Sequence, residues 1–212
     1  MQPSDENPRF WDRLARKYAA NPIADEAAYR RTLEATRARL KSSDHVFEFG
    51  CGTGMTALKL APSVAAYVAT DLSSEMIAIA QEKAADQGCT SVTFFAATLD
   101  TVEEREESFD AALAFNVLHL IRDRAAALRR VNRLLKPGGV FMSKTPCLSD
   151  ANPIYRVALP IMQLLGKAPY VGVFSAGALE REIEIAGFEV LERARHGAKR
   201  SDARPFLVAR KP

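Results

Sequence analysis

The chain has 212 residues, of which 48% are hydrophobic and 26% are charged. This length suits one domain with a sizeable core, and the charged fraction is ordinary for a globular protein. The formal net charge of only +3 argues against a chain whose whole surface is built to attract nucleic acid.

The sequence also argues against secretion, membrane insertion and metal binding. Residues 1–16 are polar and charged, and no apolar run approaches the roughly 20 residues that span a bilayer. The cysteines Cys51, Cys89 and Cys147 are widely spaced and form no CxxC pair, so they indicate neither a disulfide framework nor a zinc site. We therefore predict a cytoplasmic protein with no membrane span and no metal.

Helical patterns fill the start of the chain. Residues from about 8 to 41 read as two helices separated at Asn21-Pro22, and apolar positions recur at helical spacing in the second. Asp25 is placed to cap that second helix. We interpret residues 1–42 as an N-terminal helical cap.

From His45 onward, short strands alternate with helices. The pattern predicts strands at 45–49, 66–70, 92–96, 110–115 and 140–144, helices at 55–63, 73–88 and 123–135, and a turn at 137–139. An apolar helical stretch follows at 152–165, then a loop to 174, a helix at 175–187 and final strands at 188–191 and 205–209. This alternation predicts an α/β domain over 43–212, with a mainly parallel sheet covered on both faces and a helical insertion at about 150–174.

Three glycines at alternate positions follow the first strand, in the run VFEFGCGTG at 46–54. Glycine permits a tight turn and lets a ligand approach the backbone closely. The spacing is GxGxG, which differs from the GxGxxG of a dinucleotide site and disfavours an NAD-dependent oxidoreductase. The alternative to a ligand-binding turn is a flexible loop that merely connects the strand to the helix.

Asp71 stands at the carboxyl end of the second predicted strand. A carboxylate there is placed to accept hydrogen bonds from both hydroxyls of a ribose. The alternative is a helix cap, because Asp71 lies just ahead of Ser73. Together with the glycine turn, the acid favours a nucleotide-type ligand.

Four motifs carry a family resemblance: VFEFGCGTG at 46–54, TDLS at 70–73, SFDAALAFNVLHL at 108–120 and LLKPGG at 134–139. Their order and spacing over about residues 40–145 resemble the class I S-adenosylmethionine-dependent methyltransferases. The small-molecule branch, which includes the ubiquinone and menaquinone biosynthesis methyltransferases, is the most similar. The resemblance implies a Rossmann-like α/β fold with a seven-stranded, mostly parallel sheet, helices on both faces, N-terminal helices and a short helical lid.

The resemblance also implies S-adenosylmethionine as cofactor and a small molecule as methyl acceptor. The residues that match the family's cofactor site are Tyr18, Glu48, Gly50, Cys51, Gly52, Gly54, Asp71, Leu72, Met76, Thr98, Leu99, Asn116 and Val117. Glu48 would lie near the cofactor ammonium, or alternatively order the turn by accepting backbone N–H bonds. Tyr18 would close over the methionine moiety, or alternatively be a surface residue of its helix, and Met76 would pack near the adenine or serve only as core.

The sequence departs from the family's pattern at Thr98, where relatives often carry an acid that accepts from the adenine amino group. Asp100, or the backbone of Thr98 and Leu99, would then take over that contact. His119 is a candidate general base, because its ordinary pKa lies near neutrality, although packing at the start of the next helix explains it equally well. The pattern assigns no catalytic residue beyond this candidate.

Three further readings stay open. The departure at Thr98 and the lack of a firm base fit a catalytically inactive cofactor-binding partner subunit. The segment from Arg193 to Pro212 holds seven Lys or Arg and one acid, which fits an RNA-directed methyltransferase, although a solvated hairpin is the commoner explanation and a nucleic-acid partner is disfavoured. The apolar insertion suggests an apolar acceptor, or alternatively core packing or a homodimer contact.

Overall fold

The computed structural model describes residues 8–151, 154–155, 159, 170–197 and 202–212. Seven strands form one sheet in the order β3-β2-β1-β4-β5-β7-β6. They are β1 (His45–Phe49), β2 (Ala66–Asp71), β3 (Val92–Ala96), β4 (Phe109–Phe115), β5 (Leu135–Lys144), β6 (Glu189–Arg195) and β7 (Pro205–Arg210). Strands β1 to β5 are parallel, and β7 runs antiparallel to both of its neighbours. The strand order reverses between β1 and β4, which is where ligands bind in open α/β sheets.

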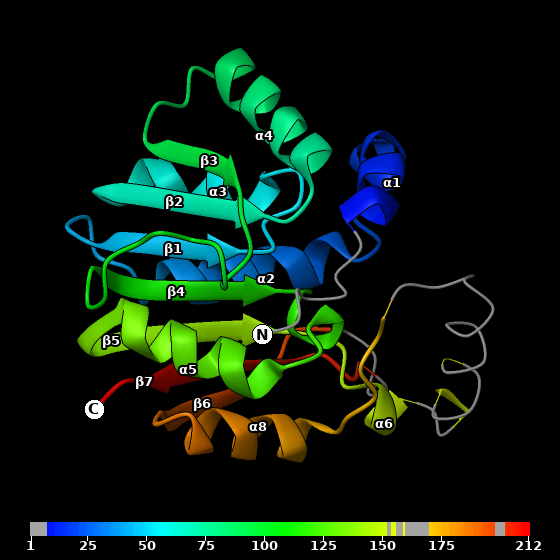
Figure 1. Cartoon of the computed structure of the whole chain (residues 1–212), viewed down its shortest axis with the longest axis vertical. Helices are drawn as coiled ribbons and strands as arrows, with labels where there is room; N and C mark the ends of the chain where they lie inside the picture. The colour runs from blue at the N-terminus through cyan, green and yellow to red at the C-terminus, as the bar shows by residue number, and fades with distance from the viewer. Residues whose placement is uncertain (1–7, 152–153, 156–158, 160–169, 198–201) are drawn as a thin grey trace.

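Helices cover both faces of this sheet, as the sequence predicted (Figure 1). One face packs against α2 (Glu26–Arg37), α3 (Met55–Leu60) and α4 (Ser74–Asp86), and the other against α5 (Arg124–Leu134) and α8 (Ala176–Ile185). The short elements η1 (Ala61–Ser63), η2 (Leu118–Leu120) and α6 (Leu148–Ala151) lie in the connections. The Rossmann-like fold expected from the motifs is confirmed.

Alternation along the strands divides the core in two. Phe47 and Phe141 point to the α5–α8 face, whereas Val46 and Met142, one residue away on the same strands, point to the α2–α4 face. All four side chains are at most 1% exposed. Because successive side chains of a strand point to opposite faces, one apolar run supplies both halves of the core.

Helix α1 (Pro8–Ala20) packs on α4 rather than on the sheet. Its Ala15 lies in a small apolar cluster with Met76 and Ile79 of α4. At the surface, Arg16 forms a bidentate ion pair with Glu82, at 2.8 and 2.9 Å. Helix α1 is therefore attached to the domain mainly through one neighbouring helix.

The helix starts follow from their caps. The side chains of Asp25, Ser73 and Ser175 accept hydrogen bonds from backbone amides three residues on, which confirms the cap predicted at Asp25. Helix α4 ends just before Gly88, whose φ of +61° is the left-handed conformation that glycine adopts readily at this position.

Strand β5 differs from its prediction, which placed a turn at 137–139 and began the strand at 140. The strand begins at Leu135, and its register against β4 shifts between the pairs Phe109–Leu135 and Ala111–Val140. Gly138, at φ +78°, donates its amide hydrogen to the Lys211 carbonyl at 2.9 Å. The segment predicted as a turn is therefore part of the strand, as a bulge that is hydrogen-bonded to Lys211.

The predicted helix at 152–165 lies largely outside the described residues, so the insertion at about 150–174 and the division at residue 42 stay predictions. In the part of the chain that the structure describes, no helix is long and apolar enough to cross a membrane.

Candidate active site

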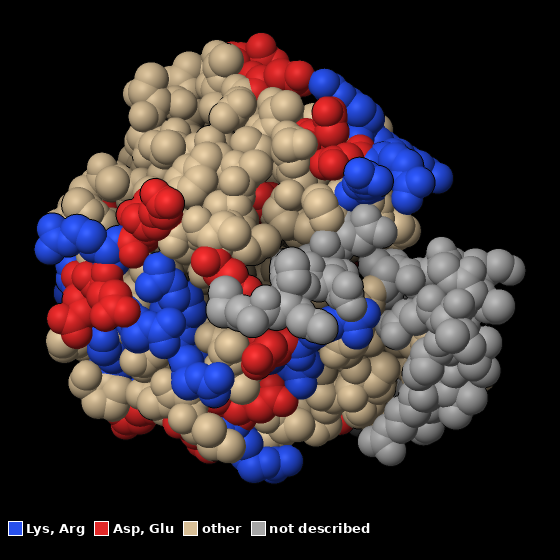
Figure 2. Space-filling view, viewed as in Figure 1, with Lys and Arg blue, Asp and Glu red and all other residues tan. Residues whose placement is uncertain are grey.

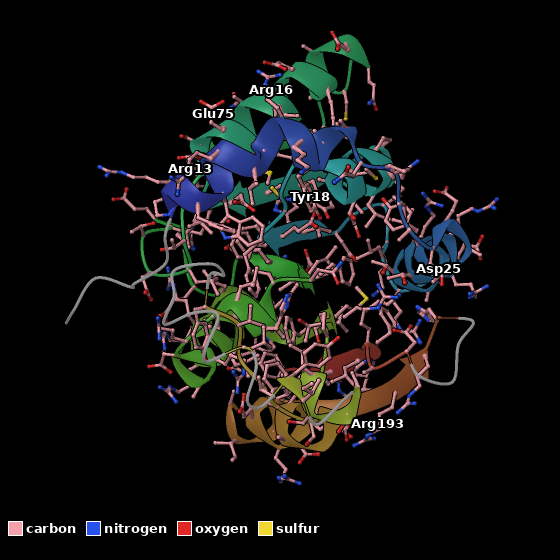
Figure 3. All side chains as sticks on the ribbon, turned by 90° about the vertical axis from the view of Figure 1, so that its right-hand side faces the viewer. Arg13, Arg16, Tyr18, Asp25, Glu75 and Arg193 are labelled. Carbon is pink, nitrogen blue, oxygen red and sulfur yellow. The ribbon has the colours of Figure 1, made fainter. Side chains whose placement is uncertain are left out.

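A cavity of about 890 Å³ opens at the carboxyl ends of the parallel strands. Its walls come from α1, α2, the glycine turn, and the loops that follow β2, β3, β4 and β5. Figure 3 looks onto this edge, with Tyr18 of α1 above it and Asp25 at the start of α2 beside it. The volume lies near the upper end of the range for small-molecule sites, about 300–1,000 Å³, which suits two ligands side by side.

The glycine turn forms one wall of the cavity. Gly50 has a φ of +65°, and a Cβ added to it would lie 2.3 Å from Cγ2 of Val117. Gly52 has a φ of +54° and lies beneath Tyr18, whose ring comes within 3.9 Å of where a Cβ would be. Glycine is therefore required at both positions for the backbone conformation, and at Gly50 also because Val117 packs directly on it.

Gly54 has a different role. Its Cβ would lie 2.8 Å from both Ala80 of α4 and the ring of Phe94 on β3, and it is not among the residues that line the cavity. The third glycine of the motif thus permits close packing behind the turn. It is the one predicted cofactor-site residue that the structure does not bring to the cavity.

Asp71 links the end of β2 to the glycine turn. Its carboxylate accepts the Gly52 amide at 2.8 Å and the Ser73 amide at 3.0 Å, and its residue is 8% exposed. Ser73, not Asp71, caps α4 through its hydroxyl, which also donates to Asp12 of α1 at 2.6 Å. Burial, the largest cause, raises the pKa of Asp71. The carboxylate is thus fixed on the cavity wall.

Glu48 is a buried acid on the same wall. It is 2% exposed, and its carboxylate accepts a hydrogen bond from the Tyr67 hydroxyl at 2.8 Å rather than from the backbone of the turn. Burial raises its pKa to about 8, against the lowering effect of Tyr67, and the charge of Asp71 adds to the rise. At neutral pH the group is therefore largely protonated until a cation enters the cavity.

The other predicted residues meet at this cavity: Tyr18, Glu48, Gly50, Cys51, Gly52, Asp71, Leu72, Met76, Thr98, Leu99, Asn116, Val117 and His119 all line it. Tyr18 is 53% exposed, at the mouth, whereas Met76 is 3% exposed. Thr98 is half-buried, and its amide donates to the Thr101 hydroxyl at 2.9 Å.

Asn116 has an unusual backbone conformation for a residue with a side chain. Its φ is +56°, in the left-handed region, and its amide donates to the Lys144 carbonyl at 2.7 Å. Asparagine tolerates this conformation better than most residues, and such strain gathers at functional sites. It directs the chain after β4 along the cavity wall.

Several residues of the cavity were not predicted from the sequence, among them Trp11, Tyr29, Thr32, Lys144 and Arg204. Lys144 could have been found from the sequence, because it is a charged residue at the carboxyl end of a predicted strand, two positions after the apolar run 140–142. Trp11 is the only tryptophan of the chain, but nothing in its local pattern indicates the cavity.

Comparisons with known proteins agree with this geometry. A family model described as a methyltransferase domain matches residues 47–141. The O-methyltransferase resE of Aspergillus sclerotiorum is 32% identical over 184 residues, which is 82% of this chain and 68% of that protein. The chain belongs to the S-adenosylmethionine-dependent methyltransferase family. Within this family, the ubiquinone biosynthesis O-methyltransferase of Azorhizobium caulinodans is 26% identical over 200 residues, covering 88% of this chain and 78% of that protein.

Solved structures show the same fold. An S-adenosylmethionine-dependent methyltransferase from Mesorhizobium loti superposes with a TM-score of 0.73 at 22% identity, over 88% of this chain and 99% of that one. Some curated relatives are much longer, since the chain spans only 25% and 42% of two of them.

The family's cofactor is S-adenosylmethionine, and the cavity fits it. The cofactor carries a ribose, for which Asp71 offers a fixed carboxylate, and an ammonium and a sulfonium, which suit a wall that holds the buried acid Glu48. Among the described residues, no group of three or more His, Cys, Asp or Glu is arranged to hold a metal ion.

His119 is held in one orientation beside the cavity. Its Nδ1 lies 2.9 Å from the Thr145 hydroxyl, and burial lowers its pKa to about 4. The imidazole is therefore neutral at pH 7, so it is free to accept a proton but is a weak base.

We expect the His119 ring to titrate near pH 4 in an NMR titration, with its signals assigned by comparison with His119→Gln. Because burial causes the shift, Thr145→Val should leave the midpoint low although it removes the hydrogen bond. A midpoint near 6.5 in the native chain would contradict the burial seen here and restore an ordinary histidine base.

Proposed function

We propose that this chain transfers a methyl group from S-adenosylmethionine to a small-molecule acceptor. The observation that carries the proposal is the hydrogen bond from the Gly52 amide to Asp71, which joins the glycine turn and the acid proposed to bind the ribose on one cavity wall. Family membership supports the same activity. When bound, the cofactor supplies an activated methyl and leaves as a neutral thioether.

The residues of the chain bind, orient and exclude water. In this proposal Asp71 accepts from the ribose hydroxyls, and Leu72 and Met76 pack near the adenine. The backbone of Thr98 and Leu99 reads the adenine edge, because Thr98 offers no charge. Glu48 faces the ammonium, while Tyr18 and Trp11 close over the mouth. Positioning of this kind contributes up to about 7–11 kcal/mol in ideal cases.

The described part of the C-terminal basic segment does not favour an RNA substrate. Arg193 pairs with Glu180 at 2.6 Å, and Arg210 and Lys211 pair with acids at 2.6 and 3.2 Å. Figure 2 shows acidic and basic side chains interspersed on the viewed face. An apolar acceptor, a homodimer and a cytoplasmic location stay predictions.

Calorimetry with S-adenosylhomocysteine, followed by transfer of labelled methyl into a metabolite extract, tests the proposal. Saturable binding and a labelled small product are the expected results. Binding without any labelled product would instead support the inactive partner subunit, and no binding at millimolar ligand would refute the assignment of this cavity as a cofactor site.

Asp71→Asn tests the acid itself. We expect cofactor binding to weaken by about 1.5–3 kcal/mol, because charge-assisted hydrogen bonds to the ribose are lost. Asp110→Asn is a matched control, since Asp110 also accepts a backbone amide, at 2.9 Å, but lies at the opposite end of the strands. A loss of only a few tenths of a kcal/mol at Asp71, with the fold intact, would assign the ribose to another group.

A further inference from the structure

Lys144 is a buried cation at the far end of the cavity from the glycine turn. It closes β5, it is 7% exposed, and it lines the cavity beside Phe115, its register partner on β4. Its side chain lies on the same face as Met142, which is the face that α2 covers. One strand, β4, lies between its strand and β1, whose last residue, Phe49, precedes the glycine turn.

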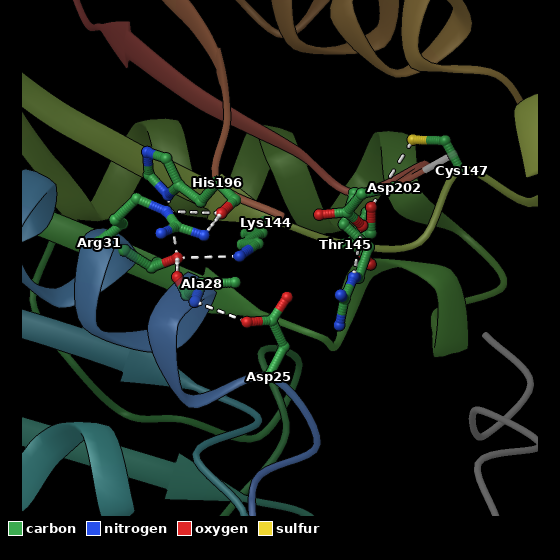
Figure 4. A network of polar contacts seen from close by, with 10 residues as sticks. Asp25, Ala28, Arg31, Lys144, Thr145, Cys147, His196 and Asp202 are labelled. Carbon is green, nitrogen blue, oxygen red and sulfur yellow. Dashed lines mark hydrogen bonds and ion pairs between the residues drawn. The ribbon is translucent and has the colours of Figure 1, made fainter. Parts of the chain in front are cut away.

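A polar network holds this lysine in place (Figure 4). Its Nζ donates to the Thr32 hydroxyl of α2 at 2.9 Å. That hydroxyl also contacts the Ala28 carbonyl at 2.8 Å and His196 Nδ1 at 2.9 Å. Because Thr32 is fixed by three partners, the ammonium is positioned before any ligand arrives.

The charge of Lys144 is not neutralised by a carboxylate contact. Within the described residues it forms no ion pair, and a lysine ammonium has three hydrogen-bond donors, of which Thr32 takes one. A buried ammonium is costly unless an anion or further acceptors complete it. The remaining donors are therefore available to a ligand in the cavity.

The neighbouring charges leave an excess of cations. Burial, then Arg204, lowers the pKa of Lys144, and Arg31 adds to this effect, whereas Asp202 and Asp25 raise it. Each acid already has another contact: Asp202 binds the Arg204 Nε at 2.7 Å, and Asp25 accepts a backbone amide of α2 at 2.9 Å.

His196 does not change this balance, because burial and the adjacent cations lower its pKa. Arg204 lines the cavity beside Lys144 and is partly open to it.

We propose that Lys144 and Arg204 bind a carboxylate on the methyl acceptor, so that the substrate class is a small organic acid. This inference rests on the proposed function and specifies its acceptor. The acid would lie across the end of the cavity opposite Asp71, with its reacting atom directed toward the cofactor wall. The carboxylate completes the hydrogen bonding of the buried ammonium and balances the local excess of positive charge.

The test compares acids with their uncharged amides. With the chain saturated in S-adenosylhomocysteine, NMR titrations would use acetate against acetamide, benzoate against benzamide, and 4-hydroxybenzoate against 4-hydroxybenzamide. We expect at least one acid to bind about tenfold or more tightly than its amide, which corresponds to about 1.4 kcal/mol. No preference in any of the three pairs would overturn the proposal.

Lys144→Met should abolish that preference while S-adenosylhomocysteine binds as before. Lys211→Met is the matched control, because Lys211 is also a partly buried lysine but lies at the other end of β7 and donates to the Leu135 carbonyl at 2.8 Å. If Lys144→Met does not fold, Arg204→Gln is used, and it should reduce the preference.

Measuring S-adenosylhomocysteine binding in the same experiment distinguishes failure of this proposal from failure of the proposed function. Loss of S-adenosylhomocysteine binding in folded Lys144→Met would show that the lysine binds the cofactor's own carboxylate, which overturns the proposal and leaves the proposed function standing. Failure of the unmodified chain to bind S-adenosylhomocysteine would instead refute the proposed function.

Discussion

Gly50→Ala is expected to abolish cofactor binding and to lower the free energy of unfolding by about 2–5 kcal/mol. Two costs add. The φ of +65° places an alanine in the left-handed region, at roughly 1–2 kcal/mol. The new methyl would also lie 2.3 Å from Val117 Cγ2, and overpacking of this kind costs typically about 1–3 kcal/mol. Denaturant unfolding and calorimetry with S-adenosylhomocysteine measure the two effects.

Gly88→Ala separates these costs. Gly88 has a similar φ of +61°, but nothing lies within 4 Å of its Cβ position, so only the backbone cost applies. Val117→Ala in the Gly50→Ala background should recover only part of the stability, because it removes Cγ2 at 2.3 Å but leaves the Val117 Cβ 2.6 Å from the new methyl. Equal losses for Gly50→Ala and Gly88→Ala would show that the packing of Val117 on the turn is not what requires a glycine.

The second large effect is a pH dependence of cofactor binding that arises from Glu48. In the free chain this acid has a pKa of about 8, because it is buried. A cationic cofactor favours its ionised form and lowers that pKa, so binding at pH 7 should release a proton. As the pH rises from the lower pKa of the bound state toward 8, the affinity should therefore increase by about tenfold per pH unit, and above pH 8 it should level off.

Calorimetry in buffers of different ionisation enthalpy measures the released proton. Glu48→Gln keeps a hydrogen-bond partner for Tyr67 but cannot ionise, so it should abolish the Glu48 part of the release. A smaller dependence from Asp71, whose pKa is also raised, should remain in that variant. An affinity that is flat from pH 5 to 8 in the unmodified chain would show that Glu48 does not sense the cofactor charge.

The same group sets the sign of the stability profile of the free chain. Its folded pKa of about 8 exceeds the ordinary value of about 4.5, so its contribution to stability is full at low pH and is lost as the pH rises toward 8. Cofactor binding and folding therefore respond to pH in opposite directions at this one residue.

Local pattern was sufficient to predict most of the fold. The bounds of β1 and β3 agree with their predictions, because each is an apolar run between clear turn residues. The start of β5 was missed because Pro137 and two glycines normally end a strand. Here the pairing with the chain terminus, through Lys211, keeps the bulged segment in the sheet.

Only part of the candidate site could be predicted from the sequence. Motifs placed Glu48 and Asp71 at the ends of adjacent strands, which by geometry brings them to one cavity. Gly54 belongs to the glycine motif, yet its role depends on packing against Phe94, which lies 40 positions later in the sequence. The local sequence pattern does not predict that contact. The position of the Lys144 ammonium likewise depends on its hydrogen bond to Thr32 of α2, which lies over a hundred positions away in the sequence.

The attachment of α1 has a kinetic consequence. Trp11 and Tyr18 belong to the wall that this helix contributes, whereas most of the other described lining residues belong to the ends of the strands, to the loops that follow them or to helices packed on the sheet. Its exposed ion pair, Arg16 with Glu82, contributes little and is screened by salt. Detaching α1 from α4 would expose the cavity and would leave both halves of the core intact. We therefore expect ligand exchange to require only a local opening, far smaller than global unfolding.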